Sequence, residues 1–477
     1  MSFSDATDGK QSTRKRVLAL SMQAPRSPGA GGETRSYYFL KALAENADLT
    51  LISLGGVDGC GRTQSDLAEI CEKVIEPELA AAERIEAKHQ TTRALQAVRT
   101  LGVLLLPWRG RWEGFLRYFV QFGLPGSADQ SRSLGKRLLT ASLKNVYRVA
   151  ARFSTIPPIT TFMFYRSFDQ CYERLRRELS HLEYDAIWCE HSTMYPLLLR
   201  LQQVVNAPVM ICNSHNIEAQ LQQRFADLAP PGWASEYWNL QAMIFGRLEQ
   251  KCYARSDLTF VCSEEDRQLG KSIAPNGNYS VVGNGVNSEY FQSVSTNCIN
   301  ADPTVVFTGG FGYEPNRDAV RFFVSEILPR IWGQRSDCRF LFAGLDAERL
   351  WNELAVNDER IQFECSPADI RPCFQRATVF VVPLRVGGGT RLKVLEAMSM
   401  GIAIVSTTLG AEGIPCESGK HLVRSDAPAE FAFEVVRLLN DSDARTSLGR
   451  EAACWVRRHF DWPILSKRIH EELASVL

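Results

Sequence analysis

The chain has 477 residues, of which 45% are hydrophobic and 23% charged, and its 54 basic and 54 acidic side chains give a formal net charge of zero. This composition is typical of a globular protein with two or three domains, and the charge balance argues against a chain-wide nucleic-acid binder, so no nucleic-acid partner is expected. Thirteen cysteines without a C-x-x-C pair argue against a disulfide scaffold and indicate reduced thiols, with no metal site.

The N-terminal segment, MSFSDATDGKQSTRKR, is polar and charged. It lacks the apolar stretch of a secretory signal, and no run of 18 apolar residues occurs anywhere in the chain. These features predict a cytoplasmic protein without a transmembrane helix.

The first elements form a strand–loop–helix–strand unit. A strand is predicted at 16–22, a loop rich in proline and glycine follows up to Gly32, a helix is predicted at 34–46, and a second strand at 48–54. This βαβ order indicates a parallel sheet.

Apolar strands recur along the rest of the chain in two sets. The first set is predicted at 185–190, 208–213 and 257–262, and the second at 304–308, 338–343, 378–384 and 402–407. Helical segments lie between these strands, including one that starts at Asp318. Apolar strands that alternate with helices predict α/β doubly wound sheets, buried on both faces. Because the pattern starts twice, we expect two domains joined within the polar segment 286–302.

Residues 64–180 depart from this rhythm and predict a helical insertion in the first domain. Within it, segment 88–152 has twelve basic and two acidic residues, a local charge of +10, and aromatic residues such as Trp108 and Trp112. Such a segment is typical of contact with an anionic membrane surface, which would make the protein peripheral on the inner face of the membrane. A helical subdomain with aromatic residues in its core and charges in solvent fits the same pattern.

The segment VVPLRVGGGTRLKVLEAMSMG, 381–401, is the most informative about chemistry. A strand ends there, three glycines follow, and Thr390 is expected to cap a helix that ends at Gly401 in the left-handed conformation. Glycines let backbone N–H groups approach an anion, and a helix N-terminus favours negative charge. Arg391 and Lys393 oppose the helix dipole unless an anion binds there, so they indicate a phosphate site.

Glu396 lies one turn after Lys393, where a carboxylate is placed to accept hydrogen bonds from ribose hydroxyls. An ordinary surface pair of Lys393 and Glu396 is the alternative. Two other acidic motifs are expected to start helices: Asp441 and Asp443 have D-x-D spacing but lie between helical segments, and Ser263 precedes an acidic first turn.

Four segments resemble the family 4 glycosyltransferases, which have the GT-B fold. GGGTRLKVLEAMSMGIAIVSTTLGAEGI resembles their nucleotide-binding segment, and NSHNIE (213–218) resembles the strand end that bears an active-site histidine. VVGNGVNSEYF (281–291) resembles the start of their second domain, and GGFGYEPNRDAVRFF (309–323) the first loop of that domain. The resemblance covers residues 281–462 well and the first domain in patches.

This resemblance implies two Rossmann-like domains that face each other across a cleft. The expected bounds are 14–285 for an acceptor-side domain that carries the insertion 64–180, and 300–462 for a nucleotide-sugar-binding domain. A C-terminal helix at about 463–477 is expected to pack back on the first domain. The family uses a nucleoside-diphosphate sugar, retains the anomeric configuration and needs no essential metal or other cofactor.

The expected site residues follow from the same resemblance and from the strand ends. His215, Arg391 and Lys393 are expected to be catalytic, and Glu190 and His191 to lie on the acceptor side. The donor is expected to contact Gly31, Gly32, Gly309, Gly310, Gly388, Gly389, Thr390 and Glu396.

The sequence departs from the family at one position. The first glutamate of the family's E-x7-E motif, which usually contacts the donor sugar, falls on Gly388. Because this glutamate is absent, the sequence does not identify the donor sugar. The expected activity is transfer to a glycan or lipid-linked acceptor in cell-surface polysaccharide or glycoconjugate synthesis. A nucleotide-sugar epimerase and a non-catalytic scaffold subunit of the same fold are the alternatives.

Overall fold

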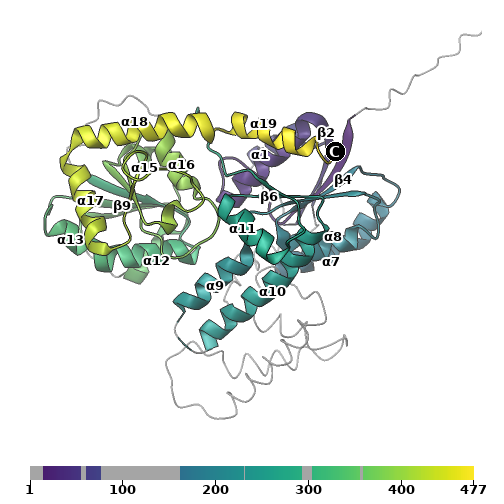
Figure 1. The fold of residues 1–477 in the computed structure, drawn as a ribbon, viewed down its shortest axis with the longest axis horizontal. Coiled ribbons are helices and arrows are strands. Elements are labelled where there is room, and N and C mark those ends of the chain that lie inside the picture. The colour runs from purple at the N-terminus through teal and green to yellow at the C-terminus, as the bar shows by residue number, and fades with distance from the viewer. Residues whose placement is uncertain are drawn as a thin grey trace, which may run out of the picture.

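A computed structural model describes residues 14–54, 61–76, 162–229, 231, 233–292, 303–354 and 358–477. Two parallel sheets lie side by side, each surrounded by helices (Figure 1). The basic segment 88–152 lies outside the described residues. None of the helices in the described ranges combines the length and apolarity that spanning a bilayer requires.

The first sheet has seven parallel strands in the order β3-β2-β1-β4-β5-β6-β7. Their bounds are β1 Lys15–Ser21, β2 Ala47–Ser53, β3 Lys73–Ile75, β4 Ala186–Glu190, β5 Val209–Asn213, β6 Leu258–Val261 and β7 Tyr279–Val281. β4 is buried at every position, as expected for a strand covered on both faces. The chain order changes direction between β1 and β4, which places the ends of β1, β4 and β5 at a point where ligands bind in doubly wound sheets.

The second sheet has six parallel strands in the order β10-β9-β8-β11-β12-β13. Their bounds are β8 Thr304–Thr308, β9 Arg339–Gly344, β10 Ile361–Cys365, β11 Val379–Val382, β12 Ile404–Ser406 and β13 Val423–Arg424. The predicted class, two Rossmann-like doubly wound sheets, is confirmed. The order changes direction between β8 and β11, so the loops after these two strands lie at the corresponding binding edge.

Helices connect the strands of both sheets. In the first half they are α1 Gly31–Asn46, α2 Gly61–Ile70, α7 Phe162–Leu179, η2 Ser192–Met194, α8 Tyr195–Leu201, α9 Glu218–Leu228, α10 Trp233–Arg255 and α11 Glu264–Ile273. In the second they are α12 Glu314–Phe322, η3 Phe323–Ile327, α13 Leu328–Trp332, α14 Ala347–Leu354, α15 Arg371–Gln375, α16 Leu392–Ser399, η4 Leu409–Ala411, α17 Pro428–Asn440, α18 Ser442–His459 and α19 Trp462–Leu473.

Two predictions of element bounds are wrong. The βα rhythm does not stop at residue 64, because α2 and β3 add a further αβ step and β3 pairs with β2. The helix expected from Asp318 starts earlier, at Glu314, since Pro315 in the first turn needs no hydrogen-bond partner for its nitrogen. The predicted caps are confirmed: Ser263 accepts from the Asp266 N–H, and Asp441 accepts from the Ala444 N–H.

The C-terminal helices link the two sheets. α18 packs on α16, and the following α19 packs on α1 (Figure 1). The Trp462 ring stacks on Tyr38 with centroids 4.4 Å apart and an interplanar angle of 10°. Leu465 and Ile469 join the apolar core on that face of the first sheet. Burial of these side chains holds the end of the chain on the first sheet.

Candidate functional site

The glycine loop, defined here as residues 387–389, follows β11 and lies against the first sheet's side of the molecule. Gly389 has φ of +66°, and a Cβ there would lie 2.3 Å from Asn216 Oδ1 and 2.7 Å from the His215 carbonyl oxygen. Only glycine fits both the backbone angle and this contact. Gly388 also faces Asn216, whose Oδ1 would lie 3.4 Å from its Cβ. The loop therefore touches the segment that follows β5.

The expected cap at Thr390 is wrong. α16 begins at Leu392, and Arg391 is its N-cap residue, without a side-chain cap. The Thr390 hydroxyl instead donates to the Cys262 carbonyl at 3.5 Å, and Asn284 Nδ2 donates to the Thr390 carbonyl at 3.1 Å. These bonds tie Thr390 to the residues that follow β6 and β7, so its hydroxyl does not cap α16. Gly401 has φ of +71°, which confirms the predicted left-handed end of α16.

Arg391 is buried beside the glycine loop. Its Nη1 donates to the carbonyl oxygens of Gly388 and Gly389, whereas its Nε and Nη2 are buried without a hydrogen-bond partner. Burial lowers the pKa of the Arg391 guanidinium. Buried donors on a charged group are costly when they are unsatisfied, so this geometry suits an anionic ligand that supplies the missing acceptors.

Lys393 points toward the loop that follows β8. Its Nζ donates to Asn316 Oδ1 at 2.8 Å and lies 4.1 Å from the centroid of the Phe307 ring. Burial, with a smaller effect of Arg391, lowers the pKa of Lys393 to about 7. A Cβ at Gly309 would lie 2.8 Å from this Nζ. The glycine therefore makes room for the ammonium group beside its own loop.

Gly310 and Glu396 are the two remaining residues of the second sheet's half that were predicted to contact the donor. A Cβ at Gly310 would meet nothing within 4 Å, so this position borders open space. Burial raises the pKa of the Glu396 carboxyl to about 7, and Lys393 lowers it in part. The alternative of a Lys393–Glu396 surface pair is wrong, because Lys393 bonds Asn316 and both side chains are partly buried.

His215 and Glu190 form a close pair at the ends of neighbouring strands. His215 Nε2 lies 2.6 Å from Glu190 Oε1, which also accepts from Ser36 Oγ at 2.8 Å and Asn213 Nδ2 at 2.7 Å. Burial raises the pKa of Glu190, but His215 and its other donors outweigh it and the pKa is lowered. Burial lowers the pKa of His215 despite the carboxylate. A neutral imidazole beside an ionised carboxylate therefore holds a fixed orientation.

The glycines at the start of α1 approach this pair. A Cβ at Gly32 would lie 3.1 Å from His215 Nδ1, and one at Gly31 would lie 3.8 Å from Leu392 at the start of α16. The structure therefore brings Gly31 and Gly32 close to His215 and to the start of α16.

His191 forms a second pair, with a partner that sequence reasoning missed. His191 Nε2 lies 3.2 Å from Glu218 Oε1, and the His191 and His215 rings are 5.2 Å apart in an edge-to-face arrangement. In both pairs one partner lies at the end of β4 and the other follows β5: Glu190 is the last residue of β4 and His191 comes directly after it, and residues 215 and 218 follow β5. Glu218 stands in the quoted NSHNIE segment, and an acidic residue that opens a helix beside a candidate histidine could have identified it.

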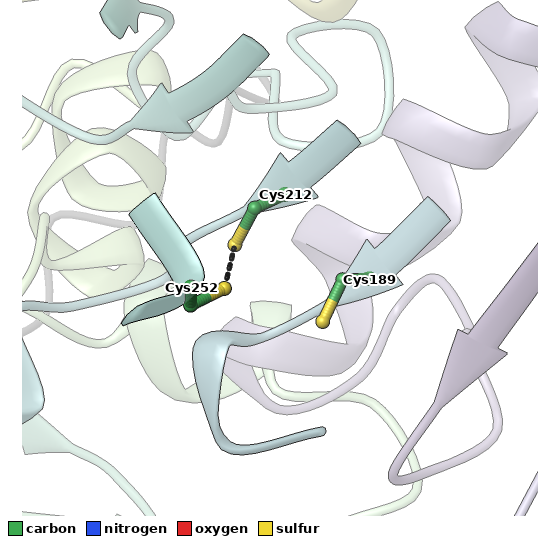
Figure 2. Close-up of side chains that lie close together, drawn as sticks. All are labelled: Cys189, Cys212 and Cys252. Carbon is green, nitrogen blue, oxygen red and sulfur yellow. Dashed lines mark hydrogen bonds between the residues drawn. The ribbon is translucent and has the colours of Figure 1, made fainter. Parts of the chain in front are cut away.

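Three cysteine thiols also come together. The Sγ atoms of Cys189, Cys212 and Cys252 lie within 4.8 Å of one another, in the apolar core between the first sheet and α10 (Figure 2). Cys252 and Cys212 are 3.6 Å apart. Sulfur ligands suit a soft metal ion, and within the described ranges these three thiols lie close enough together to share one. The candidate site described above instead combines the glycine loop with Arg391 and Lys393.

The comparisons with known proteins agree with this geometry. Residues 302–441, which contain all six strands of the second sheet, match the family described as "Glycosyl transferases group 1". This match and the GT-B fold confirm the resemblance to the group 1 glycosyltransferases that was found in the quoted segments.

Solved structures support the fold of this glycosyltransferase over almost its whole length. Sucrose-phosphate synthase from Thermosynechococcus elongatus matches with a TM-score of 0.61 at 14% identity, over 97% of this chain and 99% of that one. Anabaena Alr3699/HepE in complex with UDP and glucose matches with a TM-score of 0.57 at 13% identity, over 97% and 100%. TarM matches with a TM-score of 0.57 at 10% identity, over 97% and 99%.

A sequence relative of this glycosyltransferase is an uncharacterized 44.6 kDa protein in the cps region of Klebsiella pneumoniae. It is 21% identical over 296 residues, which cover 60% of this chain and 74% of that protein.

Proposed function

We propose that this glycosyltransferase moves a sugar from a nucleoside-diphosphate sugar to a glycan or lipid-linked acceptor, with retention of anomeric configuration, in cell-surface polysaccharide synthesis. The observation that carries the proposal is Arg391, whose Nε and Nη2 are buried without partners at the glycine loop and the N-terminus of α16. A diphosphate is an anion with oxygens to accept from both nitrogens.

The charge that develops during sugar transfer supports the roles proposed for these residues. Transfer leaves negative charge on the departing phosphate, and preorganised donors at that position lower the barrier. Arg391, Lys393 and the amides of residues 388–390 supply such donors on the second sheet's side. Glu396 accepts from the ribose hydroxyls, and His215, fixed by Glu190, faces the same site from the first sheet.

Two comparisons support the substrate classes. Two HepE structures are complexes with UDP and a third is a complex with UDP-glucose, which favours a nucleoside-diphosphate sugar for this chain also. The cps region that holds the Klebsiella relative favours an acceptor in polysaccharide synthesis.

The decisive experiment has two steps. A thermal-shift screen compares UDP, GDP, ADP, dTDP and their sugar conjugates, because a ligand specific to the folded state raises the melting temperature. The best donor is then incubated with lipid-linked and glycan acceptors, and the product is examined for its anomeric configuration. Free nucleoside diphosphate released only with acceptor supports transfer. Conversion of the sugar without an acceptor would instead identify an epimerase, and tight binding without consumption a scaffold.

The basic segment 88–152 remains the proposed membrane contact. Co-sedimentation with vesicles that contain anionic phospholipid tests it against vesicles of neutral phospholipid. Binding to the anionic vesicles that weakens with salt is expected for a surface contact. Equal recovery in both supernatants would favour a solvated subdomain.

A further inference from the structure

Asn216 lies beside position 388 of the glycine loop. A Cβ added to Gly388 would lie 3.4 Å from Asn216 Oδ1 and 3.6 Å from Asn216 Cβ, which are ordinary van der Waals distances. A Cβ at Gly389 would lie 2.3 Å from the same Oδ1. The segment that follows β5 therefore borders the glycine loop directly.

Asn216 connects this place to a carboxylate. Its Nδ2 donates to Glu218 Oε1 at 3.1 Å, and His191 Nε2 lies 3.2 Å from the same oxygen. Glu218 is the first residue of α9 and is 8% exposed. Burial raises the pKa of Glu218, but His191 and Asn216 outweigh it and the pKa is lowered, so the group is ionised at neutral pH.

The second oxygen of Glu218 is available. Oε2 receives one long bond, from Gln222 Nε2 at 3.4 Å. Gln222 lies one turn further along the same face of α9, is 4% exposed, and its Oε1 is buried without a partner. The Gln222 amide thus faces the carboxylate with its nitrogen and carries an oxygen without a donor. The carboxylate oxygen and this amide oxygen are both acceptors, and neutral hydroxyl groups are donors that would satisfy both.

Contacts link Glu218 to the glycine loop and Arg391. Asn216, which donates to Glu218 Oε1, borders Gly388 and Gly389. Arg391 Nη1 donates to the carbonyl oxygens of the same two glycines. A sugar joined to a diphosphate at Arg391 and the glycine loop starts at this boundary, next to Asn216.

We propose that Glu218 and Gln222 form a hydroxyl-binding subsite for the transferred sugar of the donor, with Asn216 and His191 positioning the Glu218 carboxylate. The subsite rests on the proposed function, because it presupposes a sugar attached to a diphosphate at the glycine loop. It supplies from the first sheet the carboxylate that Gly388 lacks.

The test distinguishes the binding of the transferred sugar from the binding of the nucleoside diphosphate. Calorimetric titration of the full chain measures the dissociation constants for UDP, GDP, ADP and dTDP and for their sugar conjugates. Glu218→Gln should leave the affinity for the nucleoside diphosphate unchanged and weaken binding of its sugar conjugate by about tenfold, because a hydrogen bond to an ionised acceptor is lost. Gln222→Leu, which removes the orphaned oxygen at similar volume, should act in the same direction.

Gln223→Leu is the matched control for Gln222→Leu. Gln223 is the next residue of α9, its side chain is exposed, and its Nε2 donates to Asp227 and Asn239 and not to Glu218. The control therefore makes the same substitution on the same helix outside the subsite, and both affinities should stay unchanged. Asn216→Ala should weaken only the sugar conjugate, as expected for a positioning residue.

The outcomes distinguish two failures. If the unsubstituted chain binds none of the nucleoside diphosphates, the proposed function fails and the subsite with it. If nucleotide binding is normal and Glu218→Gln and Gln222→Leu both bind the sugar conjugate as tightly as the unsubstituted chain, the subsite alone is overturned. A rise in the acceptor KM with unchanged donor binding would likewise overturn it and move Glu218 to the acceptor side.

Discussion

Arg224 and Glu412 form a two-pronged ion pair between the two halves of the molecule. Arg224 Nη1 and Nη2 donate to the two carboxylate oxygens of Glu412 at 2.6 Å each, and Nη1 also donates to the Gly387 carbonyl at 2.5 Å. Arg224 lies on α9, four residues before the end of the helix that opens with Glu218, and Glu412 follows η4. The pair therefore connects α9 of the first half to the glycine loop and the residue after η4 in the second half.

Arg224→Ala should raise the donor KM by about tenfold, because removing a bidentate charged partner loosens the closed arrangement around the donor. Steady-state kinetics and small-angle scattering with and without nucleotide measure the effect. Arg267→Ala is the control, since Arg267 forms an exposed pair with Glu264 within one helix. Equal donor KM values for the two variants would contradict a role in closure.

Arg391→Ala and Lys393→Ala should each reduce kcat by about 10²–10³, the usual loss when one donor to a developing oxyanion is removed. Both variants should stay folded by circular dichroism. Arg385→Ala, in the same loop but paired with Asp318 at an exposed position, should keep normal turnover. Wild-type rates in both site variants would show that the diphosphate lies elsewhere.

Glu396→Ala should raise the donor KM more than it lowers kcat, because the ribose is distant from the reacting bond. The penalty should shrink with a 2′-deoxyribose donor, which lacks one of the two ribose hydroxyls that Glu396 would hold. A penalty of equal size with both donors would argue that Glu396 acts through Lys393 and not through the ribose.

Nucleoside diphosphate binding at about pH 8 should take up a proton. The pKa of Lys393 is lowered to about 7 in the free protein, so the amine is mostly neutral at that pH. A bound anion favours the charged form and raises this pKa, which draws a proton from solvent. Calorimetry in buffers of different ionisation enthalpy measures the uptake, and Lys393→Met should abolish it. An uptake of the same size in that variant would assign the proton to another group.

Trp462→Ala should lower the free energy of unfolding by about 3–5 kcal/mol, the range for removing a large buried aromatic side chain. Trp462 is 3% exposed and stacks on Tyr38, so its loss leaves a cavity between α19 and α1. Denaturant unfolding measures the change. Phe433→Ala removes a ring that is 58% exposed and should have little effect. Similar losses for both would show that α19 contributes little to the first sheet.

Local patterns could be predicted well from the sequence. β8 occupies the predicted 304–308, and Ser263 and Asp441 cap the predicted helices, because apolar periodicity and caps depend on a few neighbouring residues. Short edge strands such as β3 and β13 were missed, since two or three residues carry too little periodicity to be recognised. The cap expected at Thr390 failed for a different reason: Cys262 and Asn284, distant in sequence, hold that residue.

The sequence by itself determined that an α/β pattern occurs twice and that a glycine loop precedes two cationic residues. Both features depend only on residues that are consecutive in the chain. Only the tertiary structure decided how Glu190 meets His215 and how His191 meets Glu218. These partners come from the ends of two strands that become neighbours through sheet order, and sequence spacing does not determine which strands pair. The ion pair of Arg224 and Glu412 likewise required the two halves of the molecule to be brought together.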